Sequence, residues 1–128
     1  MRRLTLLILA LLLGALLAAC ADEGSPSKAI EAYLKAKVAS DADELAKLSC
    51  AAWEANAAQD ALSFKSVKAE LHDMSCKAGD KDGDATLVTC EGQIAAEYDG
   101  ETRTQDLSAV TYRAVKEDGE WRMCGEQE

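Results

Sequence analysis

The order of hydrophobic and polar residues divides the chain of 128 residues into three parts. Residues 4–19 form an almost unbroken apolar run. From about residue 26 to residue 62, apolar residues recur at intervals of three and four, which is the period of an amphipathic helix. From about residue 64 to residue 124, apolar and polar residues alternate, which is the period of a half-buried β-strand. The pattern predicts a leader, a helical part and a sheet, in that order.

Two helical segments are predicted. Ser25 followed by Pro26 is a strong helix start, because a hydroxyl can cap the helix and proline suits its first position. The first helix then runs from Pro26 to about Ala39, with a stripe of four apolar side chains, Ile30, Tyr33, Leu34 and Val38. The second begins with Ser40 or Asp41 as its cap and continues to about Leu62. Cys50 lies on this second segment, either within it or at a break.

Three Asp-Gly dipeptides predict hairpin turns in the second half of the chain. They are Asp82-Gly83, Asp99-Gly100 and Asp118-Gly119. Together with the alternating pattern, these turns predict four strands, at about residues 64–77, 85–98, 103–115 and 120–124. The second strand has polar residues on one parity, which predicts a sheet with one face in water.

A β-bulge is predicted near Asp73. Ala69 and Leu71 share one parity in the first strand, whereas Met74 and Cys76 have the other. One additional residue at Asp73 would return Met74 and Cys76 to the apolar face.

Helices followed by an antiparallel meander predict an α+β fold, in which the N-terminal helices pack on one face of a curved four-stranded sheet. Three stretches carry a family resemblance: Ala29 to Leu34, Leu48 to Glu54, and Glu117 to Cys124. With them the chain resembles small bacterial lipoproteins whose exported domain is nuclear transport factor two-like, or ketosteroid-isomerase-like. The resemblance implies a cone-shaped α+β domain over residues 26–128. None of the three stretches is a catalytic motif, and no catalytic residue is carried over.

The leader has the layout of a secretory signal, with Arg2 and Arg3 before the apolar run and small residues at its end. Leu17-Ala18-Ala19-Cys20 resembles the lipobox of bacterial lipoprotein precursors. The resemblance implies that residues 1–19 are a signal peptide, that Cys20 receives lipid, and that residues 20–25 are a tether. The expected location is the extracytoplasmic side of a bacterial membrane, either the cell membrane or an outer membrane, with the lipid on Cys20 as the anchor.

Two other interpretations of the leader compete with this one. An uncleaved transmembrane helix needs about 20 apolar residues, whereas Leu4–Ala19 supplies 16. Conventional secretion with a cut after Ala19 would leave Cys20 as a free or disulfide-bonded thiol.

The charge of the mature chain restricts its partners. Without the two leader arginines it carries 12 lysines and arginines against 23 acidic residues, a net charge of −11. Nucleic-acid binding requires a basic footprint, so no nucleic-acid partner is expected. Electrostatic attraction to anionic lipid is disfavoured for the same reason, so the lipid on Cys20 must hold the protein on the membrane.

Four cysteines remain once Cys20 is assigned to lipid: Cys50, Cys76, Cys90 and Cys124. An even number in a small exported domain predicts two disulfides. A zinc site is disfavoured, because no two of these cysteines have the spacing of a zinc knuckle. No metal and no cofactor is expected.

The predicted strand order selects one disulfide pairing. Neighbouring strands lie about 4.8 Å apart, and a disulfide requires Cα atoms within about 7 Å. A Cys90–Cys124 bridge would straddle the third strand, and a Cys76–Cys124 bridge would straddle two strands. The remaining pairing is Cys76 with Cys90 and Cys50 with Cys124.

Other reactive residue types are few. Asp80 to Asp84 with Glu91 partly resembles a calcium loop, but its glycine is in the wrong position and strands flank it, so a solvated hairpin tip is predicted, with weak calcium binding as the alternative. His72 is the only histidine, and its parity predicts that it faces solvent. No nucleophile has a base beside it in the pattern, so the protein is not expected to be an enzyme.

The sequence therefore favours a non-enzymatic binding or structural role at the cell envelope. The alternative is a pocket for a small apolar ligand in the cone interior, with Trp53 and Trp121 either lining it or filling the core. The partner surface expected by resemblance is the open face of the sheet, for a second copy of the chain or for an envelope protein.

Overall fold

The computed structural model describes residues 24–128. The expected signal peptide and lipidated Cys20 lie outside the described residues. Within them the fold is α+β, with three α-helices, two short 3₁₀ helices and a five-stranded antiparallel sheet. The helical elements are α2 (Pro26–Val38), α3 (Ala42–Lys47), η1 (Ala51–Trp53), α4 (Glu54–Asp60) and η2 (Leu107–Ala109). No helix of this part of the chain is long and apolar enough to cross a membrane.

The five strands are β1 (Lys68–Asp82), β2 (Ala85–Tyr98), β3 (Glu101–Asp106), β4 (Thr111–Glu117) and β5 (Glu120–Gln127). The prediction of four strands was wrong, because the third predicted strand is divided into β3 and β4 by η2. The Asp106 side chain accepts a hydrogen bond from the Ser108 amide at 3.1 Å and so caps η2. Leu107 is then buried beneath the turn, which favours a helical turn over a continuous strand.

The strands follow the order β1-β2-β4-β5, and β3 also pairs with β2. β3 lies beside the second half of β2, from Gln93 to Tyr98. β4 lies beside the first half, from Ala85 to Thr89. The predicted Asp-Gly turns are confirmed at Asp99-Gly100 and Asp118-Gly119, where both residues have the positive φ that such a turn requires. The first turn is displaced by one residue, because Asp82 still pairs with Ala85 and the turn is Gly83-Asp84.

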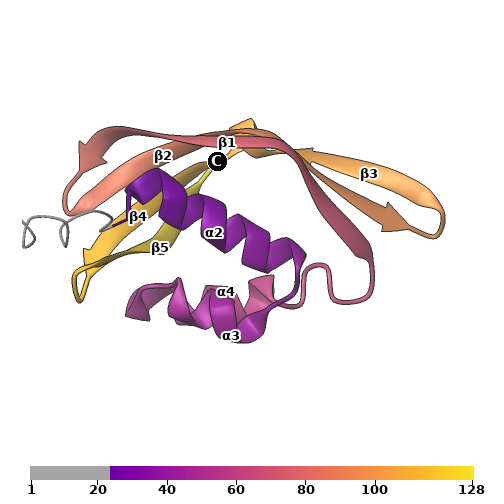
Figure 1. The fold of residues 1–128 in the computed structure, drawn as a ribbon, viewed down its shortest axis with the longest axis horizontal. Coiled ribbons are helices and arrows are strands. Elements are labelled where there is room, and N and C mark those ends of the chain that lie inside the picture. Colours follow the sequence, from indigo (N-terminus) through magenta and orange to yellow (C-terminus); the bar gives the residue numbers. More distant parts are fainter. Residues whose placement is uncertain (1–23) are drawn as a thin grey trace, which may run out of the picture.

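The sheet is bent (Figure 1), and three irregularities lie at the same level of it. The predicted bulge in β1 is confirmed, with a register shift between His72 and Ser75 and a φ of 52° at Asp73. Opposite it in β2, Gly92 has a φ of 100°, and a Cβ there would lie 2.5 Å from the His72 carbonyl oxygen. On the other side of β2, η2 separates β3 from β4 beside Gly92, because Asp106 pairs with Gln93. The bend gives the sheet its concave face.

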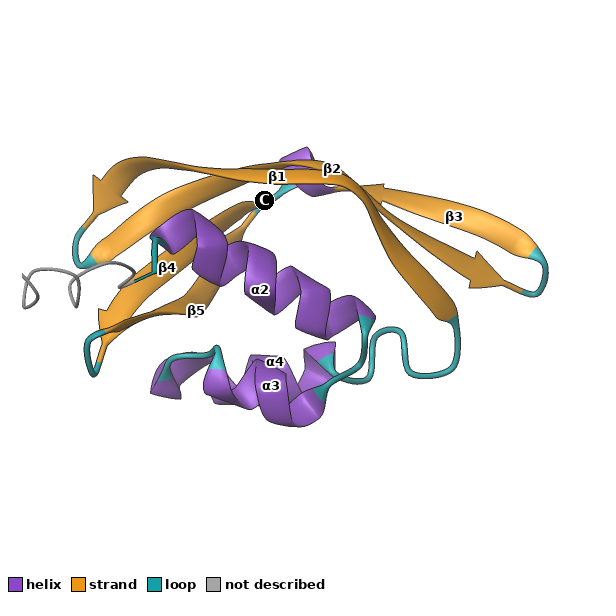
Figure 2. Cartoon of the chain, in the orientation of Figure 1, coloured by secondary structure: helices purple, strands orange, loops and turns teal. Residues whose placement is uncertain are grey.

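The α-helices lie on the concave face of the sheet (Figure 2). α2 begins as predicted, with the Ser25 hydroxyl accepting from the Lys28 amide at 3.2 Å. Its apolar stripe is buried against the sheet, and Ile30, Tyr33 and Leu34 are at most 1% exposed. α2 therefore covers the part of the concave face formed by β1, β2, β4 and β5, and a cavity of about 200 Å³ lined by Phe64, Ile94 and Tyr98 remains beside β3.

The second predicted helical segment is broken at Cys50. Asp41 caps α3 by accepting from the Glu44 amide at 3.0 Å, and α3 ends at Lys47. The chain is then extended, so the Cys50 amide donates to the Met123 carbonyl at 2.9 Å and the Met123 amide donates to the Leu48 carbonyl at 2.8 Å. These bonds cover the outer edge of β5.

Candidate functional site

All four cysteines of the described residues are joined in two disulfides. Cys50 is bonded to Cys124, and Cys76 is bonded to Cys90. These are the two pairs expected from the strand order. Cys50–Cys124 connects the break after α3 to β5, whereas Cys76–Cys90 connects directly paired residues of β1 and β2. The fifth cysteine of the sequence is Cys20, which lies outside the described part.

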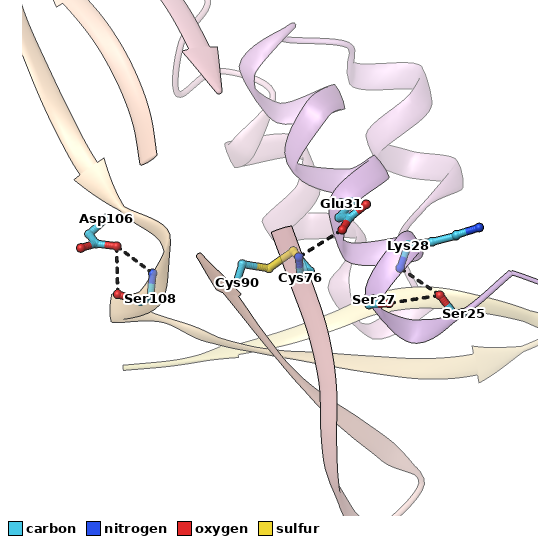
Figure 3. The surroundings of a disulfide bond; sticks show 8 residues. All are labelled: Ser25, Ser27, Lys28, Glu31, Cys76, Cys90, Asp106 and Ser108. Atoms are coloured by element: carbon cyan, nitrogen blue, oxygen red, sulfur yellow. Dashed lines mark hydrogen bonds between the residues drawn. A yellow bond between two sulfur atoms is a disulfide. The ribbon is translucent and has the colours of Figure 1, made fainter. Parts of the chain in front are cut away.

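Helix α2 is connected to the Cys76–Cys90 disulfide through one side chain. The Cys76 amide donates to Glu31 Oε1 at 3.1 Å (Figure 3). Cys90 is buried, and Cys76 packs at the edge of the core. The disulfide is one residue from the bulged segment of β1, so it holds β1 and β2 together beside the bend.

A cleft lies where the described chain begins, beside the first turn of α2 and the β4–β5 turn. Its volume is about 500 Å³. We call it the N-terminal cleft and define it by six residues, Ser25, Lys28, Ala29, Leu48, Glu120 and Trp121. This size is within the range of small-molecule pockets, about 300 to 1,000 Å³. Of the two tryptophans considered from the sequence, Trp121 lines this cleft.

The other tryptophan belongs to a chain of polar contacts on the far side of α2. Trp53 Nε1 donates to the Tyr33 hydroxyl at 3.1 Å, and that hydroxyl donates to Asp60 Oδ2 at 2.6 Å. The other carboxylate oxygen, Asp60 Oδ1, lies 2.9 Å from Lys37 Nζ. Tyr33 is fully buried, and burial together with its bond to Asp60 raises the pKa of its phenol well above the usual range. This chain of contacts connects α2 to η1 and α4.

A second pair of titratable groups lies near this chain. Tyr112 of β4 is directly opposite Glu126 of β5. Burial raises the pKa of Tyr112 to about 12, and Glu126 and Asp60 act in the same direction. Burial also raises the pKa of the Glu126 carboxyl, although the nearby Lys37 opposes that shift. Asp60 thus acts on both phenols, and its carboxylate is bonded to Tyr33 and Lys37.

The other residues considered from the sequence, His72 and the acidic hairpin, do not form a common site with these groups. His72 is on the outer face of β1 as its parity predicts, 53% exposed, with Nε2 3.7 Å from Glu70 Oε2. In the acidic hairpin, the Asp82 carboxylate is held by Arg113, and Glu91 is exposed on β2. Residues 24–128 contain no cluster of three metal-ligating side chains.

Sequence reasoning missed Asp60, which accepts from Tyr33, and Lys37, which pairs with Asp60. Lys37 is four residues after Tyr33 on α2, so it lies on the same face of the helix as the buried stripe, and that spacing was the available signal. No sequence signal indicated Asp60, because only the packing of α4 against the other helices brings its carboxylate to the Tyr33 hydroxyl.

No known protein family, curated protein or solved structure matches this chain. The fold defines its class as a small, two-disulfide α+β domain with helices on the concave face of a bent antiparallel sheet.

Proposed function

We propose that this protein is a bacterial lipoprotein, cleaved before Cys20 and held by lipid on that cysteine at the extracytoplasmic side of a membrane. Its domain over residues 26–128 then has a non-enzymatic binding role at the cell envelope. The observation that carries the proposal is the use of the cysteines. Four of five are paired within the domain, which suits an oxidising compartment, and the fifth closes the lipobox-like stretch.

The binding site that we assign to this role is the N-terminal cleft. Gly24 is part of its lining, and Cys20 is four residues before Gly24. Four extended residues reach about 14 Å at most. A lipid on Cys20 would therefore hold the cleft close to the membrane surface.

A binding role agrees with the state of the reactive groups in the described residues. The carboxylate beside the buried Tyr33, that of Asp60, is bonded to Tyr33 and Lys37. The imidazole of His72 is on the opposite face of the sheet. We also propose that the domain is a nuclear transport factor two-like cone, and the helices on a bent antiparallel sheet support this assignment.

The export proposal is tested by expressing the full chain in a bacterium and determining the mass of its N-terminal peptide. We expect an N-terminal Cys20 carrying acyl chains, in the membrane fraction. The Cys20→Ser variant should lose both the lipid and the processing, whereas Ala21→Ser should keep them. An intact Met1, or an unmodified Cys20 thiol, would contradict the proposal.

A second candidate function is the binding of a small apolar ligand. The N-terminal cleft favours it, because Leu48, Ala29 and Trp121 provide apolar walls. The site would then lie at the start of α2. Titration with hydrophobic small molecules should change the tryptophan fluorescence saturably, and Trp121→Leu should abolish the change. Tryptophan emission that did not change with any of these molecules would exclude binding of a small apolar ligand.

A further inference from the structure

We propose that the N-terminal cleft binds the headgroup of a zwitterionic phospholipid from the bilayer to which the protein is tethered. This inference deepens the proposed function and rests on it, because the lipid on Cys20 is what brings the bilayer within reach. Three features of the cleft carry it: its position, its charges and its aromatic wall.

The position of the cleft limits what can enter it. Its lining includes Gly24, the first described residue. With Cys20 held at the bilayer surface, the cleft is within about 14 Å of the headgroups. Phospholipid headgroups are therefore present at high local concentration, and even a weak site would be occupied.

The charges of the cleft match a headgroup that carries both signs. Lys28 is exposed on the first turn of α2, and its ammonium makes no ion pair within residues 24–128. It can hold a phosphate oxygen. On the opposite side of the cleft, Glu120 presents a carboxylate, one oxygen of which lies 3.2 Å from Arg122 Nη2. The Glu120 carboxylate can accept from the headgroup ammonium.

The apolar part of the cleft suits the rest of such a lipid. Trp121 is half-buried, and an indole face attracts an ammonium group by cation–π interaction. An indole is also the side chain that most favours a membrane interface. Leu48 and Ala29 provide the surface on which the glyceryl carbons can lie. The cleft volume of about 500 Å³ leaves room for one headgroup.

The charge of the whole domain selects among lipids. The mature chain has a net charge of −11, which repels a bilayer of anionic lipid. A zwitterionic headgroup has no net charge, so it avoids this repulsion while still offering a phosphate to Lys28 and an ammonium to Glu120. Phosphatidylethanolamine is the simplest lipid with this chemistry.

The test is calorimetric titration of the purified lipoprotein, held in amphipol, with dihexanoyl-phosphatidylethanolamine. We expect saturable binding of one lipid per chain. Lys28→Gln and Trp121→Leu should each weaken it about tenfold, because each removes one of the main contacts. The matched control is Lys35→Gln, which removes an exposed lysine of the same helix that does not line the cleft and should bind as the unaltered protein does.

Two comparison compounds identify the ligand, and the mass of the N-terminal peptide separates this inference from the proposed function. Equal binding of dihexanoyl-phosphatidylglycerol would overturn the zwitterionic assignment, and equal binding of free phosphoethanolamine would overturn the lipid as its source. No saturable binding by protein whose Cys20 lipid is verified by mass spectrometry would overturn the cleft inference alone. An unmodified Cys20 in the same preparation would overturn the proposed function, and with it the bilayer as the source of the ligand.

Discussion

The hydroxyl of Tyr33 donates to Asp60 Oδ2 at 2.6 Å. The same hydroxyl accepts from Trp53 Nε1 at 3.1 Å, and Lys37 Nζ is 2.9 Å from the other oxygen of Asp60. The Tyr33 phenol therefore joins α2 to η1 and α4, and its loss would leave two polar groups without their partner.

Tyr33→Phe should destabilise the domain by about 1 to 3 kcal/mol, because the Asp60 carboxylate and the Trp53 indole lose a hydrogen bond in a partly buried place. Urea unfolding followed by circular dichroism measures the change. Tyr98→Phe is the matched control, since that hydroxyl has no hydrogen-bond partner in the described structure and its removal should cost under about 0.5 kcal/mol. Equal losses in the two variants would contradict the importance of the Tyr33 contacts.

The two disulfides should contribute unequally to stability. Cys50–Cys124 spans 74 residues and Cys76–Cys90 spans 14. The loop-entropy relation then gives roughly 4.5 kcal/mol for the first and about 3 kcal/mol for the second. Paired Cys→Ala variants, Cys50 with Cys124 and Cys76 with Cys90, should therefore differ in urea midpoint in that order. The opposite order would show that local packing outweighs loop length.

Peptide mapping without reduction tests the pairing itself. We expect one peptide pair that joins Cys50 to Cys124 and another that joins Cys76 to Cys90. A peptide that joined Cys50 to Cys76 would exclude the observed strand order, because each cysteine is fixed to its own element.

Gly92→Ala should destabilise the bend of the sheet strongly, by about 3 kcal/mol or more. Its φ of 100° is unfavourable for alanine, and the added Cβ would lie 2.5 Å from the His72 carbonyl oxygen. Gly83→Ala is the control, because Gly83 also has a positive φ, of 64°, but has open space around it. Its cost should be limited to about 1 to 2 kcal/mol. Thermal unfolding of the two variants gives the comparison.

The Glu126 carboxyl should give stability a pH dependence. Burial raises its pKa in the folded protein above the ordinary value of 4.5, so the folded state binds the proton more tightly than the unfolded state does. The free energy of unfolding should therefore decrease as the pH rises from about 4.5 through the raised pKa. Glu126→Gln should remove this decrease. Urea unfolding at several pH values measures it, and an unchanged slope in the variant would contradict the assignment.

Much of the fold followed from local patterns. The Ser25 cap, the stripe on α2, the Asp-Gly turns and the bulge at Asp73 each depend on neighbours within a few residues, so the sequence carried their signals. The division of the third strand was missed, although Asp106 and Ser108 form a local turn that predicts it. An apolar residue such as Leu107 fits a strand or a helical turn equally well, and only its burial between β3 and β4 decided between them.

The candidate site was less predictable. Trp121 was identified as either core or pocket, and its place in the N-terminal cleft depends on how close the β4–β5 turn lies to the first turn of α2. Lys28 and Glu120 are far apart in the sequence and gave no joint signal. Asp60 and Glu126 were missed for the same reason.

By itself, the sequence determined the order of helices and hairpins, the net charge, and the even number of cysteines after Cys20. These are properties of composition and short-range periodicity, which need no knowledge of distant contacts. The tertiary structure alone decided that α2 packs on the concave face, that Asp60 is bonded to Tyr33, and that a cleft opens between Lys28 and Trp121. Such arrangements come from packing between elements that lie far apart in the chain, and no local pattern of residues encodes that packing.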